Sequence, residues 1–346
     1  MEETQKLIQN LLGDQEPLQK IEKLFGEASY RVYYRVWSSQ RTLIVMQLPA
    51  GIQSASEEIT NYQGSKDELP FINVQRYLFG QGLPLPQIIK SDLVHGLVLL
   101  EDLGDQSFEK CVIAAGAGSR LKLYQSALDL LLQLQKVGEQ HPDPTCIAFQ
   151  RSFDLNLLTW EFDHFLEYGI EDRLEVKIPE AKKTQLRSLA LQVIEPIVKI
   201  PYGLTHRDFQ SRNLMAYQNQ FYLIDFQDAL QGPPQYDLVA LLRDSYIQLA
   251  WEEVDALLKY YWQARKKLGL KEMNEEEFYK NFHRITLQRK LKDAGRFQYI
   301  YKVKKNPNFL PHTPSSLAYV KQAFYFLPEY RELQKELAFY LPELAE

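Results

Sequence analysis

The sequence lacks the features of several large classes of protein. Its only two cysteines, Cys111 and Cys146, form no disulfide framework and do not have the spacing of a metal site. No stretch of about 20 apolar residues is long enough to cross a bilayer. The first residues, MEETQKLIQNLLG, lack the basic start and apolar run of a signal peptide. We therefore expect a cytoplasmic protein without a membrane partner.

Long basic runs are also missing. The formal net charge is −5, so the chain does not resemble a protein that binds nucleic acid by neutralising phosphates. Hydrophobic residues make up 45% and charged residues 25%, which is an ordinary globular composition. These observations favour a small-molecule ligand over a nucleic-acid partner, and they do not indicate an oligomeric state.

The apolar periodicity changes along the chain. Extended segments are predicted at 30–37 and 42–46, joined by a hairpin turn at 38–40, and again at 87–91 and 96–100. Helices are predicted at 4–12, 71–80, 117–138, 153–168 and 180–199 and from about 236 onward, with loops and short strands at 202–230.

With 346 residues the chain is longer than one core usually grows. We predict an α+β, bilobal, protein-kinase-like fold, with a small β-rich N-lobe at 1–103 and a large, mainly helical C-lobe at 104–346. The connection between the lobes would lie in Glu101-Asp102-Leu103-Gly104-Asp105.

The most informative stretch is LTHRDFQSRNLM, residues 204–215. Asp208 and Asn213 stand in a polar loop between apolar flanks. A carboxylate here can accept a proton from an attacking hydroxyl, and the amide can offer an oxygen ligand to Mg²⁺. Asp225 follows at the end of the apolar run FYLI, where its carboxylate would face a second position of the metal. Positioning and charge neutralisation are most of what phosphoryl transfer requires of a protein.

A purely structural reading of these residues also exists, because Asp and Asn often cap turns. The combination of H-x-D-x-x-x-x-N with a following I-D-F triplet favours catalysis, since it matches the catalytic-loop and metal-binding motifs of kinases. We interpret His206 as a packed structural residue and not as a base. Arg207 either contacts phosphate or holds the loop.

The runs HRDFQSRNLM and LIDFQDALQGPPQYDLVALLRD resemble the aminoglycoside phosphotransferase-like superfamily. Within it they are most similar to the bacterial N-acetylmuramate/N-acetylglucosamine anomeric sugar kinases of cell-wall recycling. The resemblance extends to GEASYR at 26–31, to LLEDLG at 99–104 and to RKLKDAGRF at 289–297.

This resemblance implies an ATP-dependent kinase with Asp208 as the base and Asn213 and Asp225 as Mg²⁺ ligands. It places ATP against the loop that contains Gly26, Ser29 and Arg31 and against the hinge residues Glu101 and Leu103. It also implies that Asp237 braces the catalytic loop. We expect His206 to support the same loop as a packed structural residue.

Three positions depart from the protein-kinase pattern. The nucleotide loop has one glycine, Gly26, so a backbone cradle for phosphate is less complete. Met46 and Gln47 stand where protein kinases have a phosphate-binding lysine, and Gln227 replaces the glycine of D-F-G. Arg31 or Arg35 could supply the missing cation.

The acceptor is left open by the residues alone. An amino sugar is the first hypothesis, and an aminoglycoside or choline is the second. A polycationic acceptor calls for clustered carboxylates, whereas the acidic runs at 252–253 and 275–277 are typical of solvated helix faces.

A nucleotide-binding pseudokinase scaffold is the non-enzyme alternative. A protein kinase is disfavoured because no A-P-E segment follows Asp225. Aromatic residues that could stack on a sugar or pack in the core are Trp160, Trp251, Trp262, Tyr299 and Tyr301.

Overall fold

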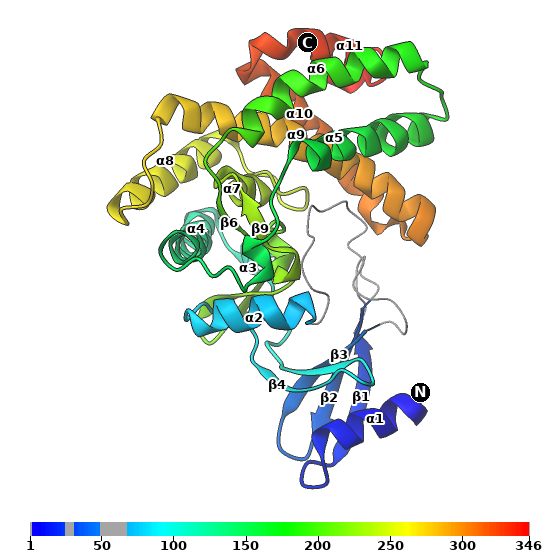
Figure 1. The fold of residues 1–346 in the computed structure, drawn as a ribbon, viewed down its shortest axis with the longest axis vertical. Coiled ribbons are helices and arrows are strands. Elements are labelled where there is room, and N and C mark those ends of the chain that lie inside the picture. Colours follow the sequence, from blue (N-terminus) through cyan, green and yellow to red (C-terminus); the bar gives the residue numbers. More distant parts are fainter. Residues whose placement is uncertain (1, 25–30, 49–67, 346) are drawn as a thin grey trace.

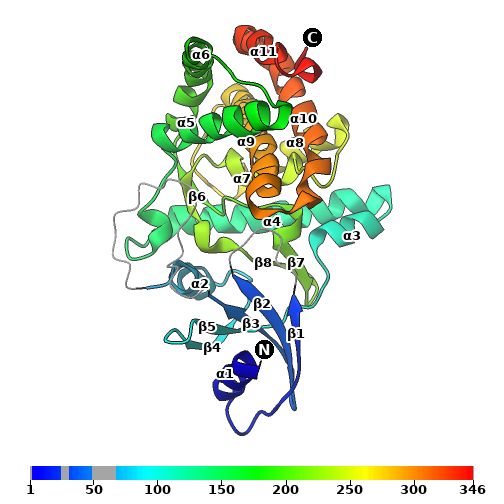
Figure 2. The ribbon, with the colours of Figure 1, turned by 90° about the vertical axis from the view of Figure 1, so that its right-hand side faces the viewer.

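The computed structural model describes residues 2–24, 31–48 and 68–345. Figures 1 and 2 show a small sheet-containing lobe at one end, which carries the N-terminus, and a larger helical lobe that ends at the C-terminus. The predicted α+β, bilobal arrangement is confirmed. The division at 103/104 into two domains stays a prediction. In the part of the chain described, no helix is both long and apolar enough to cross a membrane.

The small lobe is built on one antiparallel five-stranded sheet. Its strands are arranged in the order β1 (Leu18–Leu24), β2 (Val32–Ser38), β3 (Thr42–Gln47), β5 (Leu97–Glu101) and β4 (Ile88–Asp92). The amphipathic helix α1 (Glu2–Leu12) buries Ile8 and Leu11 against Val36 and Val45 of this sheet. The hairpin of β2 and β3 and the strands β4 and β5 are where the sequence predicts them.

The large lobe is mainly helical. Its helices are α3 (Phe108–Ala114), α4 (Ala117–Gln140), α5 (Leu155–His164), α6 (Glu180–Val198), α7 (Gln235–Leu242), α8 (Trp251–Lys267), α9 (Glu275–Lys304), α10 (Thr313–Phe326) and α11 (Arg331–Ala338). Short 3₁₀ segments are η1 (Ile147–Phe149), η3 (Ser211–Asn213), η4 (Phe226–Asp228), η5 (Pro307–His312), η6 (Pro328–Tyr330) and η7 (Pro342–Leu344).

Four features differ from the sequence prediction. β1 was missed because it is an edge strand with charged, exposed positions. α3 was missed; it begins at Phe108, directly after the hinge, with Ser107 as its N-cap. α4 does not stop at Gly138 but continues to Gln140. The helix predicted at 153–168 continues past α5 as a π-helical segment, η2 (Phe165–Asp172).

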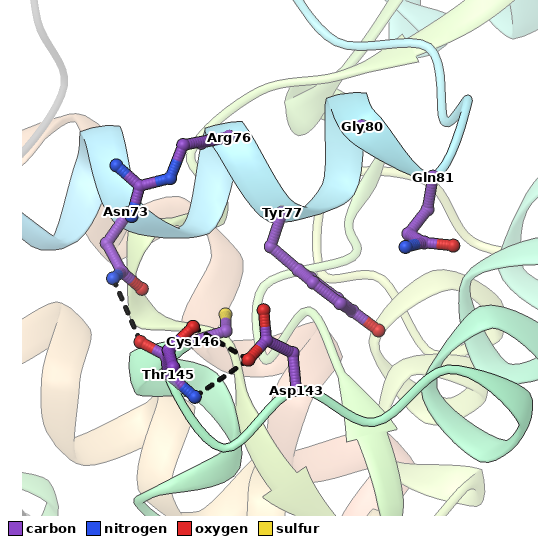
Figure 3. Close-up of a pocket in the computed structure, with 8 residues that line it drawn as sticks. All are labelled: Asn73, Arg76, Tyr77, Gly80, Gln81, Asp143, Thr145 and Cys146. Atoms are coloured by element: carbon purple, nitrogen blue, oxygen red, sulfur yellow. Dashed lines mark hydrogen bonds between the residues drawn. The ribbon is translucent and has the colours of Figure 1, made fainter.

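Helix α2 (Pro70–Gly80) lies between the sheet and the helical lobe (Figure 1). Asn73 donates to the Thr145 carbonyl at 3.1 Å and accepts from the Ile147 N–H at 2.8 Å. Tyr77 donates to the His141 carbonyl at 2.8 Å. Figure 3 shows this junction, where a cavity of about 200 Å³ opens between the helix and residues 143–146. These bonds attach α2 to the large lobe.

Two short β pairs position the central loop of the large lobe. β6 (Gly203–Thr205) pairs with β9 (Leu230–Gly232), and β7 (Leu214–Tyr217) pairs with β8 (Gln220–Leu223). β6 passes close to α4 because Gly138 has no side chain. A Cβ atom added at Gly138 would overlap the side chain of Leu204.

Gly138→Ala should therefore destabilise the fold, by about 1–3 kcal/mol as overpacking usually does. Gly118→Ala is the matched control. It lies on the same helix with nothing within 4 Å of an added Cβ, and alanine is favoured over glycine in helices by up to about 1 kcal/mol. Urea denaturation should show a lower midpoint for Gly138→Ala and an equal or higher one for Gly118→Ala. Equal midpoints would contradict the close contact between α4 and β6.

Candidate active site

A β-hairpin brings Asn213 and Asp225 together. In the β7–β8 pair, Leu214 is opposite Leu223. One position beyond, the Ile224 N–H donates to the Asn213 carbonyl at 3.1 Å. Asn213 and Asp225 therefore leave the hairpin at the same end. The Asn213 side chain then turns back to donate from Nδ2 to the Asp208 carbonyl at 2.9 Å.

Asp208 lies beside a positively charged stretch of α9. Its Oδ1 is 3.2 Å from Nη2 of Arg289, whose side chain is only 3% exposed, whereas 37% of the Asp208 side chain is exposed. Burial by itself raises the pKa of Asp208. The positive charges of Arg289, Lys292 and Arg207 outweigh burial and lower that pKa to about 2. Asp208 is therefore a carboxylate throughout the physiological pH range.

The backbone before Asp208 is held by Asp237, which is fully buried. Asp237 Oδ2 accepts from the His206 N–H at 2.6 Å, and Oδ1 accepts from the Arg207 N–H at 2.9 Å. The next turn is held by Asp244, whose Oδ2 accepts from the Ser211 N–H at 2.8 Å. Two buried carboxylates thus fix the loop on both sides of Asp208.

His206 and Arg207 both lie inside the protein, 1% and 3% exposed. The His206 Nε2 lies 3.0 Å from the Ile224 carbonyl. Burial lowers the pKa of His206 to about 4, so its ring is neutral at physiological pH. Of the two readings for Arg207, its burial fits the one in which it holds the loop.

Asp225 has a left-handed backbone, with φ of 62°, which is uncommon for any residue except glycine. Gln227, at the position of the glycine in D-F-G, donates to Asp225 Oδ1 at 3.0 Å and to Asp228 Oδ2 at 2.9 Å. Burial raises the pKa of Asp225 to about 6, and repulsion from Asp208 adds to the effect. Two carboxylates that repel each other favour a bound cation between or beside them.

The donor set fits a hard divalent cation. The side-chain nitrogen of Asn213 donates to the Asp208 carbonyl, so its amide oxygen is available as a ligand. Asp225 has a second carboxylate oxygen without a hydrogen bond to any described residue. Mg²⁺ in such sites takes one or two protein oxygens and receives the others from phosphates and water. Residues 2–24, 31–48 and 68–345 contain no group of three or more His, Cys, Asp or Glu side chains that could hold a metal ion.

The two candidate arginines of the small lobe differ in position. Arg31 Nη1 lies 3.9 Å from Asp225 Oδ1. Arg35 instead bonds to the hinge, through Nη2 to Asp102 at 3.0 Å and through Nη1 to Asp105 at 2.8 Å. Met46 is fully buried in the core, so β3 presents no cation there. Of the two candidate arginines, Arg31 is therefore the one that lies near the metal-ligand candidate Asp225.

The other nucleotide-site candidates fall in two groups. Glu101 ends β5 and Leu103 is buried in the hinge, where Gly104 has a φ of 75°. Gly26 and Ser29 lie outside the described residues.

Several comparisons with known proteins bear on this site. Residues 20–273 match the model of the phosphotransferase enzyme family. The chain belongs to that family. It is 29% identical to the N-acetylmuramate/N-acetylglucosamine kinase of Pseudomonas aeruginosa, over 93% of this chain and 88% of the relative.

Solved structures share its fold. A choline kinase from Streptococcus pneumoniae matches with a TM-score of 0.60 at 15% identity, covering 92% of this chain and 99% of that one. An ADP-bound aminoglycoside phosphotransferase, APH(2'')-Ib, matches with a TM-score of 0.57 at 14% identity, covering 93% and 97%. At these identities the likeness shows that this chain and the solved structures share one protein-kinase-like fold.

The sequence reasoning missed three contributors to the site of this phosphotransferase. Arg289 and Lys292 appeared only as part of a late helix, and Asp244 was not considered. No local signal marked Arg289 and Lys292 as buried, because their burial appears only in the packed fold. Charged residues at 289, 290 and 292 occupy positions that are buried in the fold.

One expectation about another residue needs correction. Glu253 does not lie on a solvated face, because it pairs with Arg120 of α4. Of the aromatic residues, whose role the sequence left open, Trp262 packs in the core at 6% exposed. Trp160 and Tyr299 are partly buried, and the ring of each lies 5.2 Å, centroid to centroid, from the buried ring of His164.

Asp237→Asn should destabilise the phosphotransferase. An amide offers one acceptor oxygen where two backbone N–H groups need one each, and a buried unsatisfied donor costs about 1–3 kcal/mol. The urea midpoint should fall and kcat should fall with it. Asp92→Asn is a partly exposed control whose hydrogen bonds are local, to His95, and it should leave both nearly unchanged. An unaltered midpoint for Asp237→Asn would show that Asp237 does not brace the loop.

Proposed function

We propose that this enzyme transfers the γ-phosphate of ATP to the anomeric hydroxyl of N-acetylmuramate or N-acetylglucosamine, in the cytoplasm, as a step of cell-wall recycling. The observation that carries the proposal is the likeness to a kinase of that name over 93% of the chain. The arrangement of Asp208, Asn213 and Asp225 supports it, because phosphoryl transfer to a hydroxyl is served by a proton acceptor placed close to metal ligands.

In the proposed reaction Asp208 orients the acceptor hydroxyl and takes its proton. Asn213 and Asp225 would hold Mg²⁺, which when bound neutralises charge on the phosphates. Arg31 adds a positive charge near Asp225. Glu101 and Leu103 would meet the adenine with backbone groups of the hinge, and Gly26 and Ser29 would lie against the phosphates. These residues act mainly by positioning and by electrostatics, as phosphoryl transfer allows.

The low pKa of Asp208 bears on the choice of hydroxyl. A carboxylate with a pKa of about 2 is a weak proton acceptor. An anomeric hydroxyl is more acidic than an ordinary alcohol, so it loses its proton to a weaker base. A loose transition state also requires little nucleophilic push from the acceptor. An anomeric acceptor is therefore matched to this carboxylate.

The charge around Asp208 disfavours the aminoglycoside and choline alternatives. Arg289 and Lys292 both lower the pKa of Asp208, so part of its negative charge is already compensated. A cationic acceptor would gain less from this carboxylate than from an uncompensated one, whereas a neutral sugar does not depend on that attraction. The pseudokinase alternative is disfavoured because both metal-ligand candidates and Asp208 keep oxygen atoms that make no hydrogen bond to a described residue.

The acceptor assignment is tested with free sugars and their 1-O-methyl glycosides. Methylation removes the proposed nucleophile and leaves the other hydroxyls in place. N-acetylglucosamine and N-acetylmuramate should be phosphorylated, and their methyl glycosides should not, when product is followed by phosphorus NMR. Glycosides that react as fast as free sugars would overturn the anomeric assignment. Turnover of choline or an aminoglycoside, without turnover of either sugar, would overturn the amino-sugar assignment.

Removal of the metal ligands should have unequal effects. Asp225→Ala should abolish the Mg²⁺-dependent part of ATP binding, and Asn213→Ala should weaken it less, since a carboxylate is the stronger ligand for a hard cation. Calorimetric titration with ATP in the presence of Mg²⁺ measures this, and titration with EDTA is the control. Equal, mild losses in the two variants would contradict the assignment of both residues as ligands.

A further inference from the structure

Helix α9 carries a buried arginine beside the catalytic loop. Arg289 is 2% exposed and lies between the buried residues Gln288 and Lys290. Its guanidinium lies over the ring of Tyr236, 4.7 Å from the centroid. Burial of an arginine is costly unless its charge is compensated and its N–H groups are bonded. The identity of its partners is therefore informative.

Both of its polar partners belong to the catalytic loop. Nη1 donates to the Arg207 carbonyl at 2.7 Å, and Nη2 donates to Asp208 Oδ1 at 3.2 Å. Within the described residues, the carboxylate of Asp208 is the single ion-pair partner of Arg289. A planar guanidinium holds its two N–H donors in a fixed geometry. It therefore sets the direction of the Asp208 carboxylate relative to the backbone that precedes it.

The backbone conformation supports the same role. Arg207 has a φ of 76°, in the left-handed region that non-glycine residues avoid. Such strain persists only where the surroundings enforce it. Here Asp237 holds the Arg207 N–H at 2.9 Å and Arg289 holds the Arg207 carbonyl. The residue next to Asp208 is thus fixed on both of its backbone polar groups.

One consequence concerns the free oxygen of Asp208. Oδ1 is occupied by Arg289, and Oδ2 makes no hydrogen bond to a described residue. Since 37% of the side chain is exposed, that second oxygen is available to an acceptor hydroxyl.

We propose that Arg289 is a positioning residue for phosphoryl transfer: it holds one oxygen of Asp208 and the preceding carbonyl, and thereby directs the other oxygen toward the acceptor hydroxyl. The proposal rests on the proposed function only in taking Asp208 as the proton acceptor. It does not depend on which sugar is the substrate.

The decisive experiment is a double-mutant cycle of Arg289→Gln and Asp208→Asn. Arg289→Gln alone should lower kcat about 10²-fold, the scale of a misplaced catalytic group, with little change in the KM for ATP. In the Asp208→Asn background the carboxylate that Arg289 positions is already absent, so the same substitution should change kcat by no more than about twofold. That is the scale within which independent effects usually add. A merely structural arginine would lower kcat by the same factor in both backgrounds, and that result would overturn the proposal.

Two further variants keep the test valid if Arg289→Gln folds poorly. Arg289→Lys retains the charge but not the two-point geometry, so kcat should lie between the wild-type and Arg289→Gln values. Arg284→Gln is the matched control. It removes another buried arginine of α9, which bonds to Tyr330 and Glu277 and contacts neither Arg207 nor Asp208. Its kcat should stay at the wild-type value; a loss equal to that of Arg289→Lys would overturn the proposal.

Failure of this proposal is distinguishable from failure of the acceptor assignment. The cycle is followed as ADP release with whichever acceptor the wild-type enzyme turns over, and with water as the acceptor if no sugar reacts. Additive losses in the cycle refute the role of Arg289, whereas a negative sugar panel refutes only the amino-sugar assignment.

Discussion

The site depends on the buried carboxylate of Asp237. It accepts hydrogen bonds from the backbone N–H groups of His206 and Arg207, the two residues directly before Asp208. A backbone N–H buried without an acceptor is costly, so these two bonds decide where the loop can run. Arg289, Asp244 and the β7–β8 hairpin then complete a loop whose path has already been set. Asp208, Asn213 and Asp225 meet because each is attached to this framework.

Charge is distributed differently from the protein-kinase pattern. β3 buries Met46 where a protein kinase has its phosphate-binding lysine. Arg35, the more central arginine of the sheet, is committed to Asp102 and Asp105 and so stiffens the hinge. Arg31 is the residue beside Asp225. On the other side of the cleft, α9 supplies Arg289 and Lys292. The positive charge near the reacting groups thus comes from the large lobe as well as from the small one.

Helix α2 is attached to the large lobe. Asn73 and Tyr77 bond to the loop after α4, and Phe71 packs on Phe226 with ring centroids 4.9 Å apart. Phe226 follows Asp225 directly. The helix is therefore coupled to the segment of the large lobe that carries the metal-ligand candidate Asp225.

The sequence by itself determined the local features. Periodicity predicted α1, α2, α6, the β2–β3 hairpin and the strands β4 and β5, since each depends on contacts between near neighbours or on one buried face. Asp208, Asn213 and Asp225 were singled out because they match the catalytic-loop and metal-binding motifs of kinases, and one short hairpin joins the last two. The charged edge strand β1 was missed for the opposite reason. Its residues are mostly exposed, so they do not show the alternation of a half-buried strand, and only pairing with β2 defines it.

Only the tertiary structure decided the roles of the charged residues. Arg289 meets Asp208 across 81 positions of sequence, and Arg35 meets Asp105 across 70. Nothing local distinguishes these arginines from solvated ones, because the burial and the partner of a charged side chain are properties of the packed fold. The same holds for the aromatic residues: packing placed Trp262 in the core and left Trp160 and Tyr299 partly buried.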